Sequence, residues 1–438
     1  MAKQLIDLAP PEEKAVLVGA PLKRSNARTM AREHLRELER LADTAGARVV
    51  GELTQQLDKP DPATYIGSGK LDELKALVAD SGATVVIFDD ELSPAQGKNL
   101  EEEMGKRVID RAELILDIFA VRARSAEAHM QVELAQLEYS LPRLTRMWTH
   151  LEKFRGGIGV RGPGETQLET DRRLVGHRIK LLKDRLAEVT KSREVQRKGR
   201  RNAYKVALVG YTNAGKSSLL KALSGAADVF VEDRLFATLD PLTREVTLRD
   251  VAEKPSNAPL LITDTVGFIR KLPHHLVASF RATLEEVREA DVLLHVIDAS
   301  SSGWEEQRLV VDEVLGELGV HDRPLLHVFN KVDRMAPADL AALRERMANL
   351  LPGSVFVSAV AAGGTQELQA ELRARLDASR PLLRLRIPAA AGKLLAEVHR
   401  EADVVETTSD PETGDSLLAV RADDALRGRL ERAGVVAG

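Results

Sequence analysis

The chain has 438 residues, of which 44% are hydrophobic and 30% charged, and its formal net charge is −4. This length exceeds what one hydrophobic core usually supports, so several domains are expected. The absence of cysteine excludes disulfides and Cys-based zinc sites, and no apolar run approaches the roughly 18 residues that a membrane span needs. Residues 1–14 also lack the pattern of a signal peptide, so we expect a soluble cytoplasmic protein.

Residues 1–121 are predicted to form an N-terminal α/β domain with a parallel sheet, because short apolar runs alternate with helical patterns. The expected strands lie at 15–18, 48–50, 84–88 and 107–109. The expected helices lie near 28–44, 69–80, 93–105 and 112–121.

One stretch of this domain, Tyr65–Lys70, superficially resembles a phosphate-binding loop. Thr64 stands where such a loop needs glycine, and no strong strand precedes it. We interpret the stretch as the turn that starts a helix, with ATP binding as the alternative.

Residues 122–201 are predicted to form an antiparallel helical hairpin that ends in a basic linker. Apolar residues recur at helical spacing in two seams. The seams are Met130, Leu134, Leu137, Leu141, Leu144, Trp148 and Leu151, then Leu168, Val175, Ile179, Leu182, Leu186 and Val189. The Gly-rich loop 155–164 separates them, and Pro142 is expected to kink or split the first helix.

This segment is also basic, with 19 Lys and Arg against 10 Asp and Glu, although the whole chain is acidic. Such a segment indicates a surface for a large anion such as nucleic acid. The candidate RNA-binding residues are Arg155, Arg161, Arg172 and Arg173. The alternatives are a solvated helical face and a hairpin that packs on the following domain as a clamp.

Residues 202–380 are predicted to form a third domain. Near its start lies a phosphate-binding loop, Gly210–Ser217, which has the spacing G-x-x-x-x-G-K-S. An apolar run precedes the loop and a helical pattern follows it, which is the expected strand-to-helix context. Backbone N–H groups from Asn213 to Ser218 are expected to cradle the β-phosphate. Lys216 is expected to bridge the β- and γ-phosphates, and Ser217 to ligate Mg²⁺.

Three later segments complete a guanine-nucleotide site: Asp264–Gly267, Asn330–Asp333 and Ser358–Ala359. Asp333 can accept from both N–H groups of guanine, whereas adenine lacks this pair. Together the segments predict Mg²⁺-dependent hydrolysis of GTP to GDP and phosphate. Asp333 as a plain surface turn residue is the alternative.

The residues expected to contact nucleotide share these segments and one further loop. They are Gly210, Tyr211, Thr212, Asn213, Ala214, Gly215, Lys216, Ser217, Ser218, Phe236, Ala237, Thr238, Leu239, Asp264, Thr265, Val266, Gly267, Asn330, Lys331, Asp333, Ser358, Ala359 and Val360. Catalytic roles are expected for Lys216, Thr238 and Gly267. Thr238 is the second predicted Mg²⁺ ligand, with Thr243 and Thr247 as rivals.

The residue after Gly267 is Phe268, which cannot orient water by hydrogen bonding. We therefore expect slow intrinsic hydrolysis that depends on a partner. Asn213 matches a loop position that resembles the asparagine of potassium-activated GTPases, so K⁺ dependence is a second hypothesis. His274 and His275 are interpreted as surface residues, with a catalytic role as the alternative.

Residues 381–438 are predicted to form a small α+β domain. A strand is expected at 383–387 and a helix at 392–401. Two further strands and a last helix are expected to follow.

Several stretches resemble the signature of the HflX GTPases, which are ribosome-associated P-loop GTPases related to translation factors. These stretches are 126–128, 131–137, 141–144, 156–169, 171–173 and 264–268. The resemblance implies a factor, expected to be monomeric, that binds the large ribosomal subunit and its RNA and separates stalled or idle ribosomes. It also implies that the hairpin loop points towards the peptidyl-transferase region. The alternatives are an ATP- and GTP-dependent RNA-remodelling protein and a non-ribosomal switch that recruits a protein effector.

Overall fold

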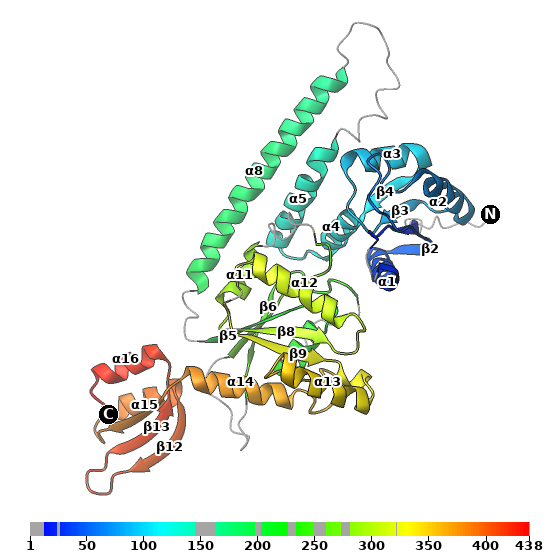
Figure 1. Ribbon diagram of the computed structural model, residues 1–438. Helices are drawn as coiled ribbons and strands as arrows, with labels where there is room; N and C mark the ends of the chain where they lie inside the picture. Colours follow the sequence, from blue (N-terminus) through cyan, green and yellow to red (C-terminus); the bar gives the residue numbers. More distant parts are fainter. Residues whose placement is uncertain are drawn as a thin grey trace, which may run out of the picture. The chain divides into compact units, whose positions relative to one another are not determined.

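The computed structural model describes residues 13–23, 27–144, 163–197, 203–226, 234–248, 260–272, 281–320 and 322–437. The chain divides into two compact units. Figure 1 shows the helices and strands of both. Unit 1 comprises residues up to Thr190 together with Asp233–Leu239 and Lys271–Arg281, and unit 2 comprises the remainder. Among the described residues, none of the helices combines the length and the apolar character that a bilayer span requires.

Unit 1 contains a four-stranded parallel sheet in the order β2-β1-β3-β4. Its strands are β1 (Glu13–Gly19), β2 (Ala47–Thr54), β3 (Val85–Phe88) and β4 (Arg107–Asp110). The helices between and after them are α1 (Ala27–Ala45), α2 (Ser68–Ser81), α3 (Pro94–Met104) and α4 (Arg111–Arg122). The predicted α/β domain is therefore confirmed, and Val16, Ile66, Leu74 and Phe88 belong to its core.

Local signals explain where these helices begin. Ser93 and Gln96 form a reciprocal capping box at the start of α3, and the Asp110 side chain accepts from the Glu113 N–H at the start of α4. Helix α2 begins at Ser68, directly after the Tyr65–Gly67 turn, and Lys70 Nζ lies 2.8 Å from Glu73 Oε2. The interpretation of Tyr65–Lys70 as a helix-start turn is confirmed.

The first predicted hairpin helix is present as α5 (Ala126–Ser140) and is followed by the 3₁₀ helix η1 (Leu141–Arg143). The α-helix thus ends at Ser140, and Pro142 lies in the 3₁₀ turn that follows; the rest of the first predicted seam, with Trp148 and Leu151, lies outside the described residues. The second is α8 (Pro163–Arg197), and its start corrects the predicted loop 155–164. Pro163 and Gly164 belong to the helix, because a first-turn proline has no N–H to leave unbonded. Residues 145–162, including Arg155 and Arg161, lie outside the described part of the chain.

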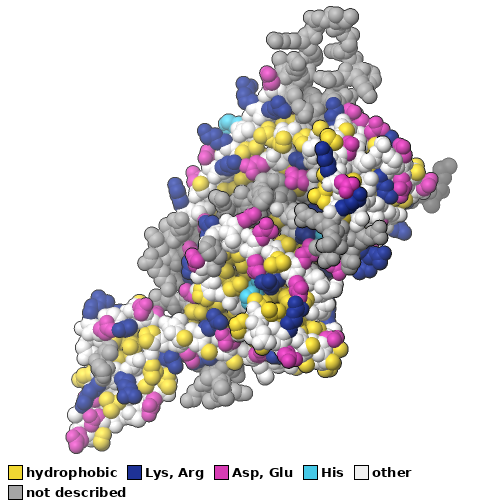
Figure 2. Space-filling model, in the orientation of Figure 1, with side chains coloured by type: hydrophobic (Ala, Val, Ile, Leu, Met, Phe, Trp, Pro, Cys, Tyr) yellow, Lys and Arg dark blue, Asp and Glu magenta, His cyan; other side chains and the backbone are white. Residues whose placement is uncertain are grey.

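Helices α5 and α8 are joined by ion pairs between Glu133 and Arg178 and between Glu138 and Lys183. Leu182 in the second seam is fully buried. Arg172 and Arg173 on α8 are exposed, and Figure 2 shows Lys and Arg side chains along this helix.

Unit 2 contains a six-stranded sheet in the order β10-β9-β8-β5-β7-β6, in which only β6 runs antiparallel to its neighbour. The strands are β5 (Tyr204–Gly210), β6 (Leu242–Val246), β7 (Leu260–Asp264), β8 (Val292–Asp298), β9 (Leu325–Asn330) and β10 (Val355–Phe356). The helices are α9 (Lys216–Ser224), α11 (Arg281–Glu289), α12 (Trp304–Glu317), α13 (Pro337–Leu350) and α14 (Gln366–Ser379), with the 3₁₀ helix η3 (Val332–Arg334). Because β5, β7, β8 and β9 are parallel, their carboxyl ends share one edge, where ligands of open α/β sheets bind.

The C-terminal part of unit 2 is the predicted α+β domain. Its antiparallel sheet has the order β12-β13-β11-β14. The elements are β11 (Leu382–Ile387), α15 (Gly392–Glu401), β12 (Asp403–Ser409), β13 (Ser416–Arg421), α16 (Asp424–Arg432) and β14 (Val436–Ala437). Strand β14 was not expected, because two residues carry no periodic signal.

Candidate nucleotide site

The loop between β5 and α9 requires glycine at two positions. Gly210 has φ +152°, and a Cβ there would lie 2.3 Å from the Val296 carbonyl oxygen. Gly215 has φ +95°, and a Cβ there would lie 2.3 Å from Nδ2 of Asn330. Asn213 also has a left-handed backbone, with φ +59°. The loop is thus wrapped closely around the neighbouring strand ends, as a phosphate cradle requires.

Lys216 is the first residue of α9 and is only 6% exposed. Its Nζ donates to the carbonyl oxygens of Gly210 at 3.1 Å and Tyr211 at 3.0 Å. Burial lowers the pKa of Lys216 to about 8, and the Asp264 carboxylate opposes this shift. The side chain remains protonated at pH 7, so it carries its positive charge inside the loop.

The hydroxyl of Ser217 and the carboxylate of Asp264 meet at the carboxyl edge of the sheet. Asp264 is the last residue of β7 and is fully buried. Ser217 Oγ donates to Asp264 Oδ2 at 2.6 Å. Two oxygen donors next to a phosphate loop are the ligand type that Mg²⁺ prefers.

The segment after β7 is hydrogen-bonded to the phosphate loop. The Thr212 N–H donates to the Phe268 carbonyl at 2.7 Å, and the Phe268 N–H donates to the Gly210 carbonyl at 3.1 Å. Gly267 is essential here, because a Cβ would lie 2.7 Å from the Thr212 Cα. The Phe268 ring is 1% exposed, so it cannot act on water. Thr265 is also buried, and its hydroxyl donates to the Leu208 carbonyl.

The residues predicted to select the base converge from the ends of β9 and β10. Asn330 Nδ2 donates to the Ala214 carbonyl at 3.0 Å, and its Oδ1 accepts from the Ala359 N–H at 3.2 Å. Lys331 has φ +64°, and its Nζ donates to the Asn213 carbonyl at 2.8 Å. Direct hydrogen bonds therefore join the phosphate loop, Asn330–Lys331 and Ala359.

The carboxylate of Asp333 is fixed by a hydrogen bond from Ser358, whose Oγ donates to Asp333 Oδ1 at 2.6 Å. Val360 follows Ala359 and is 78% exposed. Sequence reasoning missed Asp298, whose Oδ2 lies 2.8 Å from Lys331 Nζ. Asp298 ends β8, so its place at the carboxyl edge of a predicted strand was the available signal.

Four of the predicted nucleotide contacts, Phe236, Ala237, Thr238 and Leu239, belong to unit 1. The Phe236 ring is buried against Phe119 of α4, with ring centroids 4.7 Å apart and planes at 82°.

The rivals of Thr238 lie in unit 2. Thr243 is on β6, and its hydroxyl lies 2.8 Å from the hydroxyl of Thr263. His274 and His275 lie outside the described residues.

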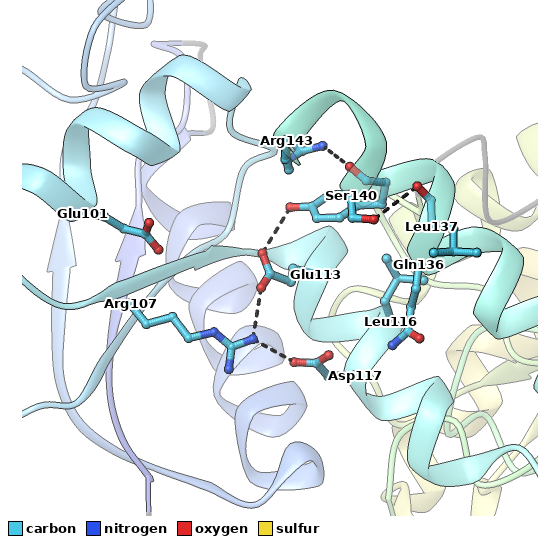
Figure 3. A pocket seen from close by; sticks show the side chains of 10 residues that line it. Glu101, Arg107, Glu113, Leu116, Asp117, Gln136, Leu137, Ser140 and Arg143 are labelled. Carbon is cyan, nitrogen blue, oxygen red and sulfur yellow. Dashed lines mark hydrogen bonds and ion pairs between the residues drawn. The ribbon is translucent and has the colours of Figure 1, made fainter. Parts of the chain in front are cut away.

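A separate cavity of about 580 Å³ lies in unit 1 between α4, α5 and η1 (Figure 3). Arg107 Nη2 pairs there with Glu113 Oε1 at 3.0 Å and with Asp117 Oδ2 at 3.4 Å. Burial raises the pKa of both Asp117 and Tyr139. Because Arg107 pairs with both carboxylates, the cavity offers mainly apolar surface to a ligand.

Three family models match consecutive parts of the chain. A model described as GTP-binding GTPase N-terminal matches residues 32–120, and one described as GTP-binding GTPase Middle Region matches 122–200. A model described as 50S ribosome-binding GTPase matches residues 205–331. A solved structure of SsGBP in complex with GDP is 26% identical and covers 83% of this chain and 98% of its own, with a TM-score of 0.47.

The phosphate loop, the Ser217–Asp264 pair and the guanine-selecting segments on a mainly parallel sheet define a P-loop GTPase. GTPase HflX of Magnetococcus marinus is 44% identical over 428 residues, which are 97% of this chain and 96% of that protein. GTPase HflX of Escherichia coli K12 is 45% identical over 391 residues, which are 89% of each chain. The chain belongs to the HflX family of GTPases, and it hydrolyses GTP.

Proposed function

We propose that this GTPase binds the large ribosomal subunit and dissociates stalled or idle ribosomes. The single observation that carries the proposal is the match of residues 205–331 to the 50S ribosome-binding GTPase model. The HflX relatives extend the match over nearly the whole chain. The basic character of residues 122–201 adds an RNA-compatible surface, with Arg172 and Arg173 exposed on α8.

In the proposed reaction, water attacks the γ-phosphate while the loop stabilises the charge that develops. Lys216 and the N–H groups of Asn213–Ser218 bind the β- and γ-phosphates, and the Gly267 N–H reaches the γ-phosphate. Mg²⁺, when bound, neutralises phosphate charge and orients the phosphates. Ser217 and Thr238 are its proposed protein ligands, with Asp264 acting through water.

Base selection is proposed to follow from the contacts that converge on Asn330. Asp333 accepts from guanine N1–H and the exocyclic amine. The Ala359 N–H reaches guanine O6, and the stem of Lys331 covers the base. The hydrogen bond from Ser358 to Asp333 fixes the carboxylate for this role.

Hydrolysis is proposed to await docking, because the buried Phe268 cannot orient water. The ribosomal partner then supplies alignment or charge. A second part of the proposal is that K⁺ binds at Asn213 and promotes hydrolysis. Asn213 lies in the phosphate loop and has a left-handed backbone. Equal hydrolysis rates in sodium and potassium would count against K⁺, and equal rates with and without large subunits would count against docking control.

The experiment is co-sedimentation with separated ribosomal subunits in the presence of GTP, GDP or a non-hydrolysable GTP analogue. Binding to the large subunit is expected to be tightest with the analogue and to fall steeply with salt. Light scattering of intact ribosomes then measures dissociation in the same buffers. Association that is weak and independent of salt would instead favour a switch with a protein effector.

The paired charge reversals Arg172→Glu and Arg173→Glu test the α8 surface. If both arginines contact phosphates, the slope of log affinity against log salt falls by about two. The matched control is the paired reversal Arg384→Glu and Arg432→Glu, which places the same charge change on exposed residues of the C-terminal domain. Equal weakening by both pairs would show a nonspecific effect of net charge.

A further inference from the structure

A cluster of two histidines and one aspartate contains none of the residues proposed above to contact the nucleotide. His295 is on β8, His327 is its direct neighbour on β9, and Asp312 comes from α12. One potential ligand atom from each residue lies within 4.8 Å of the others. The two imidazole ring centroids are 5.6 Å apart, with the ring planes tilted by 36°.

The fold brings these side chains together for a definite reason. Strands β8 and β9 are parallel, so residues in register point to the same face of the sheet. Helix α12 packs against β8 and supplies the carboxylate. Three residues that are distant in sequence therefore face one point from three elements.

One ring nitrogen of His295, Nδ1, is buried without a hydrogen bond among the described residues. The residue is 1% exposed. Asp312 Oδ1 lies 3.5 Å from this nitrogen, which is too far for a good N–H···O hydrogen bond. Leaving a buried polar nitrogen without a hydrogen-bond partner is destabilising, so a missing ligand is the natural explanation.

We propose that His295, Asp312 and His327 bind a divalent transition metal of the zinc type. Two imidazoles and one carboxylate are a common donor set for Zn²⁺, with water in the fourth position. Metal–ligand bonds of about 2.0–2.2 Å require ligand atoms roughly 3–4 Å apart. Asp312 and His327 are both only half-buried, so small side-chain rotations can close the remaining gap.

The surroundings suit this role. Arg308 Nη1 donates to Asp312 Oδ2 at 2.6 Å, which holds the carboxylate in place and leaves Oδ1 directed at His295. Burial lowers the pKa of His295 and lowers that of His327 to about 4. Both rings are therefore neutral at pH 7, which is the form that ligates a metal. The positive charge of Arg308 limits the affinity.

This metal site is separate from the Mg²⁺ site of the GTPase reaction. Mg²⁺ prefers oxygen ligands in an octahedron, whereas imidazole nitrogen selects zinc, cobalt, nickel or copper. The cluster nevertheless adjoins the phosphate loop through β8, because Val296 follows His295 and its carbonyl faces Gly210. None of the three ligands takes part in the proposed ribosomal function, so the metal site does not depend on that proposal.

The test is equilibrium binding of Co²⁺ to the full chain in the presence of excess Mg²⁺ and GDP. We expect one Co²⁺ per chain, with visible absorption typical of a low-coordinate nitrogen and oxygen site, and displacement by Zn²⁺. His327→Gln and Asp312→Asn should each weaken binding by at least the 10–100-fold that the loss of an outer-shell partner causes. His399→Gln is the matched control, because His399 is exposed in the C-terminal domain.

Circular dichroism and GDP affinity establish that each variant is folded. If His327→Gln does not fold, the test rests on Asp312→Asn. This substitution removes the charge of the carboxylate but keeps the size of the side chain. Failure of the wild-type chain to take up Co²⁺ at millimolar concentration would overturn the proposal. Undiminished binding by the folded variants would overturn it as well, since the ion would then be held elsewhere.

Discussion

At the scale of single residues, Gly267 shows how closely the nucleotide loop and the segment after β7 approach each other. A Cβ at this position would lie 2.7 Å from the Thr212 Cα and 3.1 Å from the Lys216 Nζ. The backbone of Thr212 cannot move without breaking its hydrogen bond to the Phe268 carbonyl. A single methyl group therefore displaces either the Lys216 side chain or the loop.

Gly267→Ala is expected to weaken binding of a GTP analogue by roughly 5- to 150-fold. This range corresponds to about 1–3 kcal/mol of overpacking at the contact. Fluorescent-nucleotide titration measures the affinity. Gly176→Ala is the matched control, because its Cβ would meet open space in α8, and it should leave nucleotide affinity unchanged. Equal affinities for wild type and Gly267→Ala would contradict the steric argument.

Asp333→Asn is expected to lower GDP affinity by about 3 kcal/mol, roughly a hundredfold. Each hydrogen bond to a charged group contributes about 1.5–3 kcal/mol, and the amide presents N–H where guanine also donates. Xanthosine diphosphate should bind the variant better than GDP does, since xanthine carries a carbonyl where guanine carries its amine. Asp339→Asn, an exposed change in the first turn of α13, serves as the control.

Residue-level prediction of the candidate site was possible where the signal is local. The phosphate loop, Asp264, Asn330–Asp333 and Ser358–Ala359 are short motifs with fixed spacing. The pairs Lys331–Asp298 and Ser358–Asp333 depend on which strands are neighbours in the sheet. Such contacts join distant parts of the chain, so only the assembled topology reveals them.

At the scale of secondary-structure elements, helices α5 and α8 are joined through exposed charges as well as apolar side chains. Arg178 makes two hydrogen bonds to Glu133, with Nε–Oε1 at 2.6 Å and Nη2–Oε2 at 2.8 Å. The hydrogen bond from Arg178 holds the pKa of Glu133 below its usual value. The pair therefore adds stability above the unfolded-state pKa of Glu133, and this stability is lost as the pH falls through the lower folded-state value.

Glu133→Gln is expected to reduce the folding equilibrium constant only about two- to fivefold near neutral pH, because water screens the exposed pair. The effect should shrink with added salt and vanish under acidic conditions, where Glu133 is protonated in both states. A double-mutant cycle with Arg178→Gln, followed by denaturant unfolding, isolates the interaction. A coupling energy that stays constant from neutral to acidic pH would show that charge is not its origin.

Element-level prediction followed hydrophobic periodicity. The N-terminal strands and helices and α15 repeat their apolar residues at the expected intervals, so the sequence located them. Strand β6 was not predicted, because only its last residue, Val246, is buried and the strand shows no apolar alternation. The start of α8 was misplaced because Pro163 and Gly164 are also frequent in loops.

At the scale of the whole molecule, two segments of the GTPase region belong to unit 1. Asp233–Leu239 contributes Phe236, whose ring packs on Phe119. Lys271 contributes an ammonium that lies 2.8 Å from Asp89 Oδ2 and 2.6 Å from Asp90 Oδ1. Lys271 is only four residues beyond Gly267 in the sequence, so we expect a movement of Gly267 to reach Lys271 along this short stretch of chain.

We expect hydrogen exchange to report this connection. Exchange in peptides covering Asp89–Asp90 and α4 should differ between the GDP form and the form with a non-hydrolysable GTP analogue. Peptides from β12 and β13 in the C-terminal domain serve as the control and should not change. Differences confined to residues 210–270 would show that the nucleotide state does not reach unit 1.

Because unit 1 is discontinuous in sequence, a truncation after the N-terminal region would remove part of it. A fragment that ends at the basic linker would include the four-stranded sheet, α4 and α5, yet it would lack both inserted segments. Phe119, which is 1% exposed in the intact chain, would lose the covering ring of Phe236, and the carboxylate of Asp89 would lose Lys271. Such a fragment would expose apolar surface and be prone to aggregation, so we expect the N-terminal half to fold properly only when the GTPase region is expressed with it.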